Sequence, residues 1–355
     1  MPAASSKPHW IDPPADFVLA RDYCSYGYFL LAPNHWDPPT QTFTRTLGLG
    51  AGGVVTVRVK QEGSEAGSGR VKPGAPLRVM SDRALRADER REITGLISRM
   101  LRLDEDAAHI RAFHFLDPRW KRSRGAVFDP DRARSGAGRG RLMRSPTFFE
   151  DVIKTVTSCN VTWPSTVNMN RRLCEQFGGR SESGQHGFPT ASALARIRPA
   201  ALRARCGVGY RDGRIVELAR RFARGGKPGG IESAWYEDPR TPDSEIYDAL
   251  LEWPGIGPYA AANIMQLLGR YSRLPLDTES LRHGKHVLGM KGSDRQIMKR
   301  LHEHFEPLGA HAFRSYWFEL WTYYESKHGP AWTWVREQTA KAFTAAMLKE
   351  KPAQR

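Results

Sequence analysis

The residue best placed for chemistry is Asp277, in the stretch LPLDTESLR that ends at Arg282. The sequence around it predicts a helix that begins at this aspartate, which would then serve as its N-cap. An ionised carboxylate in this position can also stabilise a developing positive charge or orient a water molecule. The positive end of the helix dipole favours the ionised form. Capping and catalysis are compatible, so Asp277 is a candidate for both.

A glycine-rich hairpin precedes this aspartate. Thr241 is the predicted N-cap of a helix with an apolar face that reaches Trp253, and the run Pro254-Gly255-Ile256-Gly257 stops that helix. The two glycines permit positive φ angles where the chain reverses. Pro258 suits the first position of the next helix, which is predicted to end at Gly269.

Such a hairpin presents unpaired backbone N–H groups at a helix N-terminus, and these groups can bind an anion. Gly255 and Gly257 have no side chain to block a close approach, so a nucleic-acid phosphate is the expected anion; a plain turn between helices is the alternative. Tyr259 and Asn263 lie one turn apart on the second helix. Tyr259 can pack or stack there, and the Asn263 amide can contact a base edge or bridge two helices.

The composition points to a polyanionic partner. The chain of 355 residues carries 54 lysines and arginines against 38 acidic residues, a formal charge of +16. Nucleic acid is the partner we expect, with ribosomal, membrane-surface and heparin-type binding as alternatives. The sequence has neither an apolar run of 18 residues nor a signal-peptide core, so we expect a soluble intracellular protein of the cytoplasm, nucleoid or nucleus, with no membrane contact. The four cysteines lack zinc spacing, and no metal is predicted.

The chain divides into four predicted segments. Residues 1–119 predict an antiparallel sheet domain with a helix, because DFVLARDYCSYGYFLLAP, GGVVTVRVKQEG and PLRVMS show strand-like runs and residues 87–103 show helical periodicity. Residues 120–144 predict a basic connector, which contacts DNA or stays solvated. Residues 145–330 predict a helical core that opens with Ser145 as an N-cap. Residues 331–355 predict a C-terminal helix or tail.

Several stretches resemble one family. LLEWPGIGPYAAANI resembles the helix-hairpin-helix of the HhH-GPD superfamily of DNA glycosylases, and the aspartate followed five residues later by arginine continues that pattern. RLMRSPTFFEDVI, RLCEQFG, GFPTASALA and GVGYRDGRI resemble the 8-oxoguanine branch, and AFRSYWFELWTYY the alkylpurine branch. The resemblance covers roughly residues 140–325. It implies an α+β fold, in which an N-terminal antiparallel sheet domain is followed by an all-α glycosylase core.

The resemblance also implies roles for single residues. Asp277 takes the place of the catalytic aspartate, and Tyr259 stands where lyase members have a nucleophilic lysine. Asn160 takes the place of the residue that wedges into the duplex, and Arg211 that of an arginine that holds the opposite cytosine; a second such arginine is replaced by Ser165. The hairpin and Arg282 would contact DNA. Asn263 and either Leu320 or Trp321 would wall the base pocket.

The sequence therefore predicts a monofunctional DNA glycosylase of base excision repair. It would act as a monomer on double-stranded DNA that contains a damaged or mismatched base. No cofactor is needed for hydrolysis, and no cysteine follows Cys206, so the iron–sulfur cluster of some members is absent. A bifunctional 8-oxoguanine-type glycosylase/lyase that uses a displaced lysine such as Lys285 is one alternative. A non-catalytic DNA-binding protein that keeps only the hairpin is the other.

Overall fold

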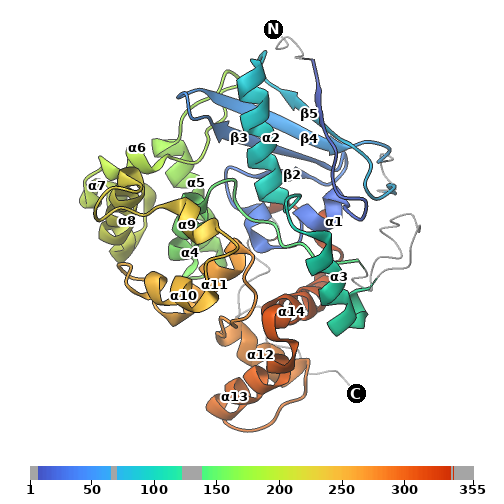
Figure 1. Cartoon of the computed structure of the whole chain (residues 1–355). Coiled ribbons are helices and arrows are strands. Elements are labelled where there is room, and N and C mark those ends of the chain that lie inside the picture. Colours follow the sequence, from blue (N-terminus) through green and yellow to red (C-terminus); the bar gives the residue numbers. More distant parts are fainter. Residues whose placement is uncertain (1–6, 65–69, 122–137, 337–338, 340–355) are drawn as a thin grey trace, which may run out of the picture.

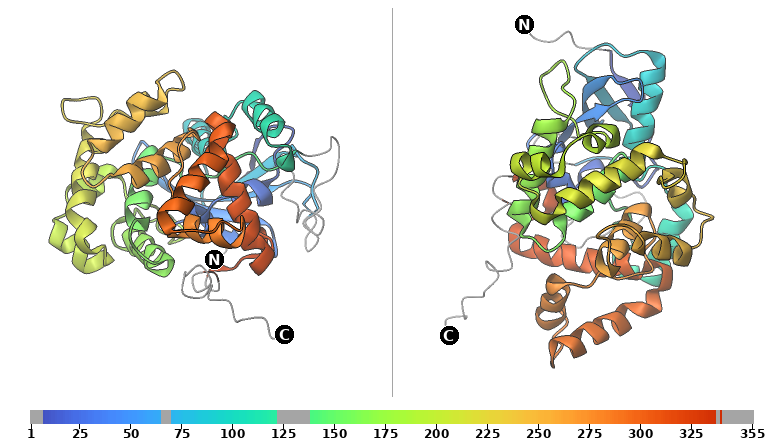
Figure 2. Two further views of the ribbon diagram at one scale, coloured as in Figure 1. Left: turned by 90° about the horizontal axis from the view of Figure 1, so that it is seen from below. Right: turned by 90° about the vertical axis from the view of Figure 1, so that its left-hand side faces the viewer.

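The computed structural model describes residues 7–64, 70–121, 138–336 and 339. Most of the predicted basic connector and of the C-terminal segment lies outside these ranges. Within them, an antiparallel sheet occupies one end of the molecule, and the helices Thr278–His286 and Asp294–Phe305 lie at the other end (Figures 1 and 2). The predicted α+β class, with a sheet domain before a helical core, is confirmed. No helix in the described ranges is long and apolar enough to cross a membrane.

The sheet has five strands in the order β1-β5-β4-β3-β2, and all neighbours are antiparallel. The strands are β1 (His9–Ile11), β2 (His35–Asp37), β3 (Thr42–Gly48), β4 (Val54–Gln61) and β5 (Leu77–Ser81). The central pair runs from Thr42 opposite Lys60 to Gly48 opposite Val54. Val55, Val57 and Val59 of β4 are fully buried, because alternate side chains point to one face of a strand.

The helices and 3-10 turns fill the rest of the described chain. They are α1 (Leu19–Tyr23), η1 (Gly27–Leu30), α2 (Ala87–Leu101), α3 (Ala107–Leu116), η2 (Pro118–Trp120), α4 (Phe148–Ser158), α5 (Trp163–Phe177), α6 (Ala191–Ala195), α7 (Pro199–Cys206), η4 (Gly209–Arg211), α8 (Asp212–Arg224), α9 (Ser233–Glu237), α10 (Asp243–Leu251), α11 (Pro258–Leu268), α12 (Thr278–His286), α13 (Asp294–Phe305), η5 (Glu306–His311), α14 (Ala312–His328) and η6 (Ala331–Thr333). Helix α2 crosses the sheet in Figure 1 and matches the helix predicted over 87–103, ending two residues earlier.

One predicted strand is wrong. The run DFVLARDYCSYGYFLLAP forms α1 and η1 instead, and its Phe17, Leu19, Tyr23 and Phe29 are buried. Short apolar runs such as FVLA and YFLLA fit a buried strand and a buried helix equally well, since neither shows a polar face. The strands expected from GGVVTVRVKQEG and PLRVMS are present as β4 and β5.

Two predicted helix starts are displaced. The N-cap of α4 is Thr147, whose hydroxyl accepts from the N–H of Glu150, and not Ser145. Helix α10 begins at Asp243, so Thr241 lies outside it and its hydroxyl donates to the carbonyl of Trp235. In both places a proline follows the predicted cap, and the backbone turns into the helix only after that proline.

The buried apolar residues form two cores. One joins the sheet region to α14 and includes Phe43, Val57, Phe318 and Trp321. The other is formed by residues between 148 and 265, together with Ala32. Helix α14 thus returns the C-terminal aromatic residues to the N-terminal part of the chain, and the predicted segment boundaries stay predictions. This return places α14 beside α12, whose N-cap is Asp277 (Figure 1).

Candidate active site

Asp277 is the N-cap of α12, as the sequence predicted. Its Oδ1 accepts hydrogen bonds from the backbone N–H groups of Glu279 at 2.9 Å and Ser280 at 3.1 Å. In return, the Ser280 hydroxyl accepts from the N–H of Asp277 at 3.0 Å, which completes a capping box. The helix end therefore fixes one carboxylate oxygen and leaves the other for a different partner.

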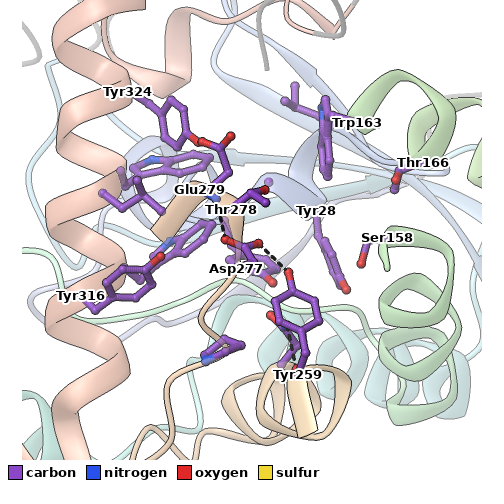
Figure 3. Close-up of a pocket in the computed structure, with 18 of the residues that line it drawn as sticks. Tyr28, Ser158, Trp163, Thr166, Tyr259, Asp277, Thr278, Glu279, Tyr316 and Tyr324 are labelled. Carbon is purple, nitrogen blue, oxygen red and sulfur yellow. Dashed lines mark hydrogen bonds between the residues drawn. The ribbon is translucent and has the colours of Figure 1, made fainter. Parts of the chain in front are cut away.

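That partner is Tyr259, in the first turn of α11. Its hydroxyl donates to Asp277 Oδ2 at 2.9 Å (Figure 3). The Asn263 amide, one turn further along α11, donates to the Tyr259 carbonyl at 3.0 Å. The N-terminal ends of α11 and α12 thus lie next to each other. Tyr259 and Asp277, 18 positions apart in the sequence, form a hydrogen-bonded pair.

Behind Asp277 lies a buried pair of hydroxyl groups. The Tyr316 hydroxyl, on α14, is 2.6 Å from Ser280 Oγ, which is 3.3 Å from Asp277 Oδ1. Ser280 already accepts from a backbone N–H, and it can donate only one proton. No other acceptor for the Tyr316 proton is found among the described residues. The consistent arrangement is that Tyr316 donates to Ser280 and Ser280 donates to Asp277.

Burial sets the protonation behaviour of this unit. It raises the pKa of Asp277, and the hydrogen bonds from the Ser280 N–H and the Tyr259 hydroxyl oppose that rise. We expected the helix end to keep the Asp277 carboxyl ionised. Its backbone N–H groups do lower the pKa of Asp277, but desolvation raises that pKa by more. Burial and the neighbouring carboxylate raise the pKa of Tyr259, so its hydroxyl stays protonated and remains a donor.

Asp277 and Tyr259 lie on the wall of a cavity of about 430 Å³ (Figure 3). The wall is built by the segment around η1, by the turn from α4 to α5, by the starts of α11 and α12, and by α14. The three predicted base-pocket residues, Asn263, Leu320 and Trp321, all line it. Their contact with a base stays a prediction. Neither lysine nor arginine is among the described residues that line the cavity.

The hairpin before α11 is built as predicted, except at one glycine. Gly255 has φ +78°, and a Cβ there would lie 2.3 Å from the Cδ of Arg214. Gly257 has φ −101°, so the expectation of a positive φ at both glycines is wrong. A Cβ on Gly257 would meet no atom within 4 Å. Gly257 is the N-cap of α11 and Pro258 its first residue, and both are exposed, so this helix end lies at the surface. The first N–H groups of a helix have no partner within it. Ile256 between the glycines is buried.

Comparison with known proteins gives a result for the fold. No protein-family model and no curated protein matches the chain. Solved structures do match. A 3-methyladenine DNA-glycosylase from Archaeoglobus fulgidus superposes with a TM-score of 0.63 at 16% identity, over 89% of this chain and 99% of that one. MBOgg1 in complex with a low-affinity DNA ligand gives 0.62 at 19% identity, over 93% and 100%.

A third match is the apo form of the Clostridium acetobutylicum 8-oxoguanine glycosylase/lyase, with a TM-score of 0.59 at 19% identity, over 89% of this chain and 97% of that one. The chain has the DNA glycosylase fold. The fold that the resemblance to the HhH-GPD superfamily implied is thus confirmed. The remaining predicted site residues can now be placed on this glycosylase fold.

Asn160 and Arg211 lie together at the end of α4. Asn160 is exposed and has φ +50°, which is uncommon outside glycine. Arg211 is buried, and its guanidinium donates to the carbonyls of Val156 (3.2 Å), Cys159 and Asn160 (3.1 Å). A cation suits the carbonyl end of a helix. Arg211 therefore holds the turn that presents Asn160, and direct DNA contact by either residue stays a prediction.

Two further residues are held by acidic partners. Arg282 donates to Glu279 Oε2 at 2.6 Å and 3.0 Å and lies over the rings of Tyr323 and Tyr324, so its predicted DNA contact would compete with these partners. Lys285 pairs with Asp294 at 2.8 Å and does not line the cavity.

Some of the cavity wall was not foreseen from sequence. The unpredicted members come from distant segments or from beside Asp277: Tyr26, Tyr28, Trp163, Glu279 and Tyr324. Figure 3 shows Tyr324 and Glu279 on one side of the cavity and Trp163 on another. Two of them lay in stretches that the sequence analysis singled out: Glu279 follows the candidate catalytic aspartate by two residues, and Tyr324 ends the aromatic stretch AFRSYWFELWTYY.

Proposed function

We propose that the chain is a monofunctional DNA glycosylase, which turns a damaged or mismatched base out of the duplex and hydrolyses its N-glycosidic bond. The observation that carries this proposal is the Tyr259–Asp277 pair on the wall of the cavity, directly after the open hairpin. The glycosylase fold supports it, and the structural neighbours include enzymes for 3-methyladenine and 8-oxoguanine.

The reaction begins with extrusion of the base, because the target atom cannot be reached inside a duplex. Extrusion costs a few kcal/mol, which contacts in the cavity and to phosphates offset. The bond from C1′ to the base nitrogen then breaks, and its electron pair leaves with the base. The sugar becomes positively charged, and water attacks C1′ and loses a proton.

Asp277 stabilises that sugar cation. Its Oδ1 is occupied by two backbone N–H groups and a hydroxyl, whereas Oδ2 receives one hydrogen bond, from Tyr259. Oδ2 is therefore the oxygen that we assign to the sugar. A fixed carboxylate in a largely dry site stabilises a developing positive charge better than water does, because it need not reorganise during the reaction.

Tyr259 is the reason for proposing hydrolysis without strand cleavage. A lyase needs an amine that forms a covalent Schiff base with the sugar, and a phenol cannot form one. The lysine considered as a substitute, Lys285, pairs with Asp294 outside the cavity wall. The proposed product is an abasic site in an uncut strand.

Double-stranded DNA is the proposed partner, bound by a monomer inside the cell. The charge of +16 and the free N–H groups after Gly257 both favour phosphate contacts. Two of the structural neighbours are DNA complexes, MBOgg1 and the Clostridium enzyme. A purely DNA-binding role would leave unexplained why a half-buried carboxylate is hydrogen-bonded to a tyrosine on a cavity wall.

A panel of duplexes that each carry one lesion tests the proposal, with uracil, a thymine mismatch, 8-oxoguanine or an alkylpurine. We expect base release from at least one duplex, and strand cleavage only after alkali. Strand cleavage by the protein alone, with an adduct trapped by borohydride, would replace hydrolysis by the lyase reaction. No release from any duplex would contradict the glycosylase function.

A further inference from the structure

The segment that carries α6, α7 and α8 holds half of the net charge of the protein. Residues 191–227 contain nine arginines and one lysine against two acidic residues, which gives +8 of the +16 of the whole chain. Eight of these ten cations are exposed, whereas Arg211 is buried and Arg221 is half-buried. The three helices lie together at one edge of the molecule (Figures 1 and 2). The proposed hydrolysis uses none of the exposed cations.

The two acidic residues of this segment already have partners. Asp212 pairs with Arg203 at 2.8 Å, and Glu217 pairs with Arg221 at 3.2 Å. The other exposed cations of the segment form no ion pair with a described residue. Their charge is therefore available to a negatively charged partner.

Some of these cations lie at the N-terminal end of α8, beside the hairpin. The Arg214 side chain lies against Gly255, and Arg205 is in the last turn of α7, which leads into this end of α8. The same end of α8 contacts the turn at Asn160 through Arg211. A duplex that binds the hairpin would lie next to these side chains.

The other cations lie at the opposite end of α8. Arg224 is about 15 Å along the helix from Arg214, since an α-helix rises about 1.5 Å per residue. Arg220 Nε donates to the carbonyl of Ala195 at 3.3 Å, which joins this end of α8 to the end of α6. Arg224 Nη1 lies 3.5 Å from the position of a Cβ on Gly229, in the loop after α8. We call this group the distal cluster, and its members are Arg196, Arg198, Arg220, Arg224 and Lys227.

The surface between the two ends offers little to a phosphate. Ala200 and Ala201 are the exposed residues there on α7, and Glu217 of α8 is negatively charged. Each DNA strand carries a phosphate about every 3.4 Å, so a single duplex along α7 and α8 would place phosphates against this stretch. The distribution of charge fits two separate contacts better than one continuous contact.

The distal cluster suits a nucleic-acid backbone. Four of its five members are arginines, whose planar guanidinium binds a phosphate through two N–H groups. Tyr210 is the exposed large apolar side chain of residues 191–227, and it lies at the other end of α8. The distal cluster thus lacks the apolar anchors on which protein partners and membranes depend. One acid lies beside it, Glu232, whose Oε2 is 3.5 Å from the position of a Cβ on Gly226, and the net charge stays positive.

We propose that the distal cluster is a second DNA-binding surface, which holds the phosphate backbone of a duplex other than the one on the hairpin. This inference goes beyond the proposed function, because it requires neither a lesion nor catalysis. One molecule then holds two duplex segments at once. A search for lesions can pass from one segment to the other while the protein stays bound to DNA.

The number of duplexes bound by one molecule tests this inference. An undamaged duplex of about 12 base pairs, little more than one helical turn, is added in excess at about 50 mM salt. Sedimentation velocity then gives the mass of the complex. We expect two duplexes on each protein molecule. A ratio of one duplex to one protein molecule would overturn the proposal.

A combined variant assigns the second duplex to the distal cluster. Glutamine keeps a polar side chain and removes the charge, and Arg220 is left unchanged because of its hydrogen bond to Ala195. We expect the affinity for the second duplex to fall by about tenfold or more, so that one duplex remains. An unchanged ratio of two in the folded variant would overturn the proposal. The changes are Arg196→Gln, Arg198→Gln, Arg224→Gln and Lys227→Gln.

A matched control removes the same charge from exposed residues elsewhere, and it should still bind two duplexes. Its changes are Arg58→Gln, Lys72→Gln, Arg91→Gln and Arg111→Gln. If the control also loses the second duplex, net charge and not the distal cluster binds it, and the proposal is overturned. The same holds if polyglutamate displaces the second duplex as readily as unlabelled duplex does at equal charge, because the surface then suits an acidic protein.

A melting curve checks that the combined variant is folded. If it is not, the double variant Arg196→Gln, Lys227→Gln takes its place, because both residues lie outside the helices. We expect it to weaken the second duplex by about threefold or more. An unchanged affinity would count against the distal cluster.

Excision separates this inference from the proposed function. On a saturating short lesion duplex, the combined variant should keep the single-turnover rate of wild type, because the distal cluster lies away from the cavity wall. Two duplexes per molecule without release of any base would support the second surface and contradict the glycosylase function. Base release with one duplex per molecule would do the reverse.

Discussion

The carboxylate of Asp277 and the hairpin at Gly255–Gly257 lie at the starts of neighbouring helices but are built in opposite ways. Asp277 is enclosed, and its two oxygens accept from two N–H groups and two hydroxyls. The hairpin offers backbone alone, and Gly257 faces open space. Both use helix N-termini: one holds a side chain, and the other is where we propose that a phosphate binds. The chemistry should therefore depend on side-chain identity, and the binding on backbone shape.

The largest effect should come from Asp277→Asn. Asparagine caps a helix about as well as aspartate, so the fold should survive while the charge is lost. We expect single-turnover excision to slow by about a hundredfold or more, with lesion binding largely unchanged. Asp294→Asn is the matched control, because Asp294 is an exposed partner of Lys285 at the start of α13. Excision near the wild-type rate by a folded Asp277→Asn protein would leave Asp277 as a cap only.

Gly257→Val should affect binding and not folding. A Cβ on Gly257 meets no protein atom within 4 Å, and its φ of −101° suits any residue. The side chain would instead stand where a phosphate approaches. We expect duplex affinity to fall by about tenfold, equally for all sequences, because phosphate contacts carry no sequence information. Fluorescence anisotropy with several duplexes measures this. A loss confined to one sequence would contradict phosphate contact.

Gly255→Ala should act on stability. The residue has φ +78°, and an added Cβ would collide with the Arg214 side chain. We expect the free energy of unfolding to fall by about 1–2 kcal/mol. Denaturant unfolding beside Gly257→Ala gives the contrast, since the latter variant should be nearly neutral. Equal stabilities would mean that the hairpin tolerates a side chain at both positions.

The ionisation of Asp277 should make the stability of the protein depend on pH. Its pKa is raised in the folded protein, so the folded state binds its proton more tightly than the unfolded state does. Its contribution to stability is then complete below the unfolded pKa and is lost as pH rises through the folded pKa. Asp277→Asn should therefore melt above wild type at neutral pH, and the gap should close in acid. A gap that widens in acid would give the opposite sign to the shift.

The smallest effect should come from Tyr259→Phe. The tyrosine hydroxyl donates to Asp277 Oδ2 and lowers its pKa, so its loss should raise that pKa further. Excision needs the ionised carboxylate, and the acid limb of its pH profile should move to higher pH by less than about one unit. If the acid limb of the pH profile does not move, the hydrogen bond from Tyr259 does not influence the pKa of Asp277.

What could be predicted from the sequence was local. Asp277 was identified as a helix cap because its capping signal lies within four residues, and Pro258 and Gly269 bounded α11 for the same reason. Thr241 and Ser145 were misplaced because a following proline moved each helix start by one or two residues. Errors of this kind arise when two local signals compete.

The cavity wall could not be predicted in full, because tertiary packing assembles it. Tyr26, Tyr28 and Trp163 come from segments far from Asp277 in the sequence and share the cavity wall with it and with α14, whose buried residues belong to the first core. Arg211 was expected to contact DNA, which stays a prediction; its hydrogen bonds to the carbonyls at the end of α4 were not foreseen. No periodicity in the sequence distinguishes an arginine that supports a turn from one that contacts a ligand.

The most direct test measures affinity and single-turnover rate together, on one excised lesion duplex, for Asp277→Asn and Gly257→Val. If the Asp277 carboxylate serves the chemistry and the exposed hairpin serves binding, the two variants should have opposite effects on rate and affinity. Asp277→Asn should lose the rate and keep the affinity, whereas Gly257→Val should lose affinity and keep the rate once the duplex is saturated. If both variants lose the same quantity, or if Asp277→Asn keeps its rate, chemistry and binding are not divided in this way and Asp277 is not the catalytic group.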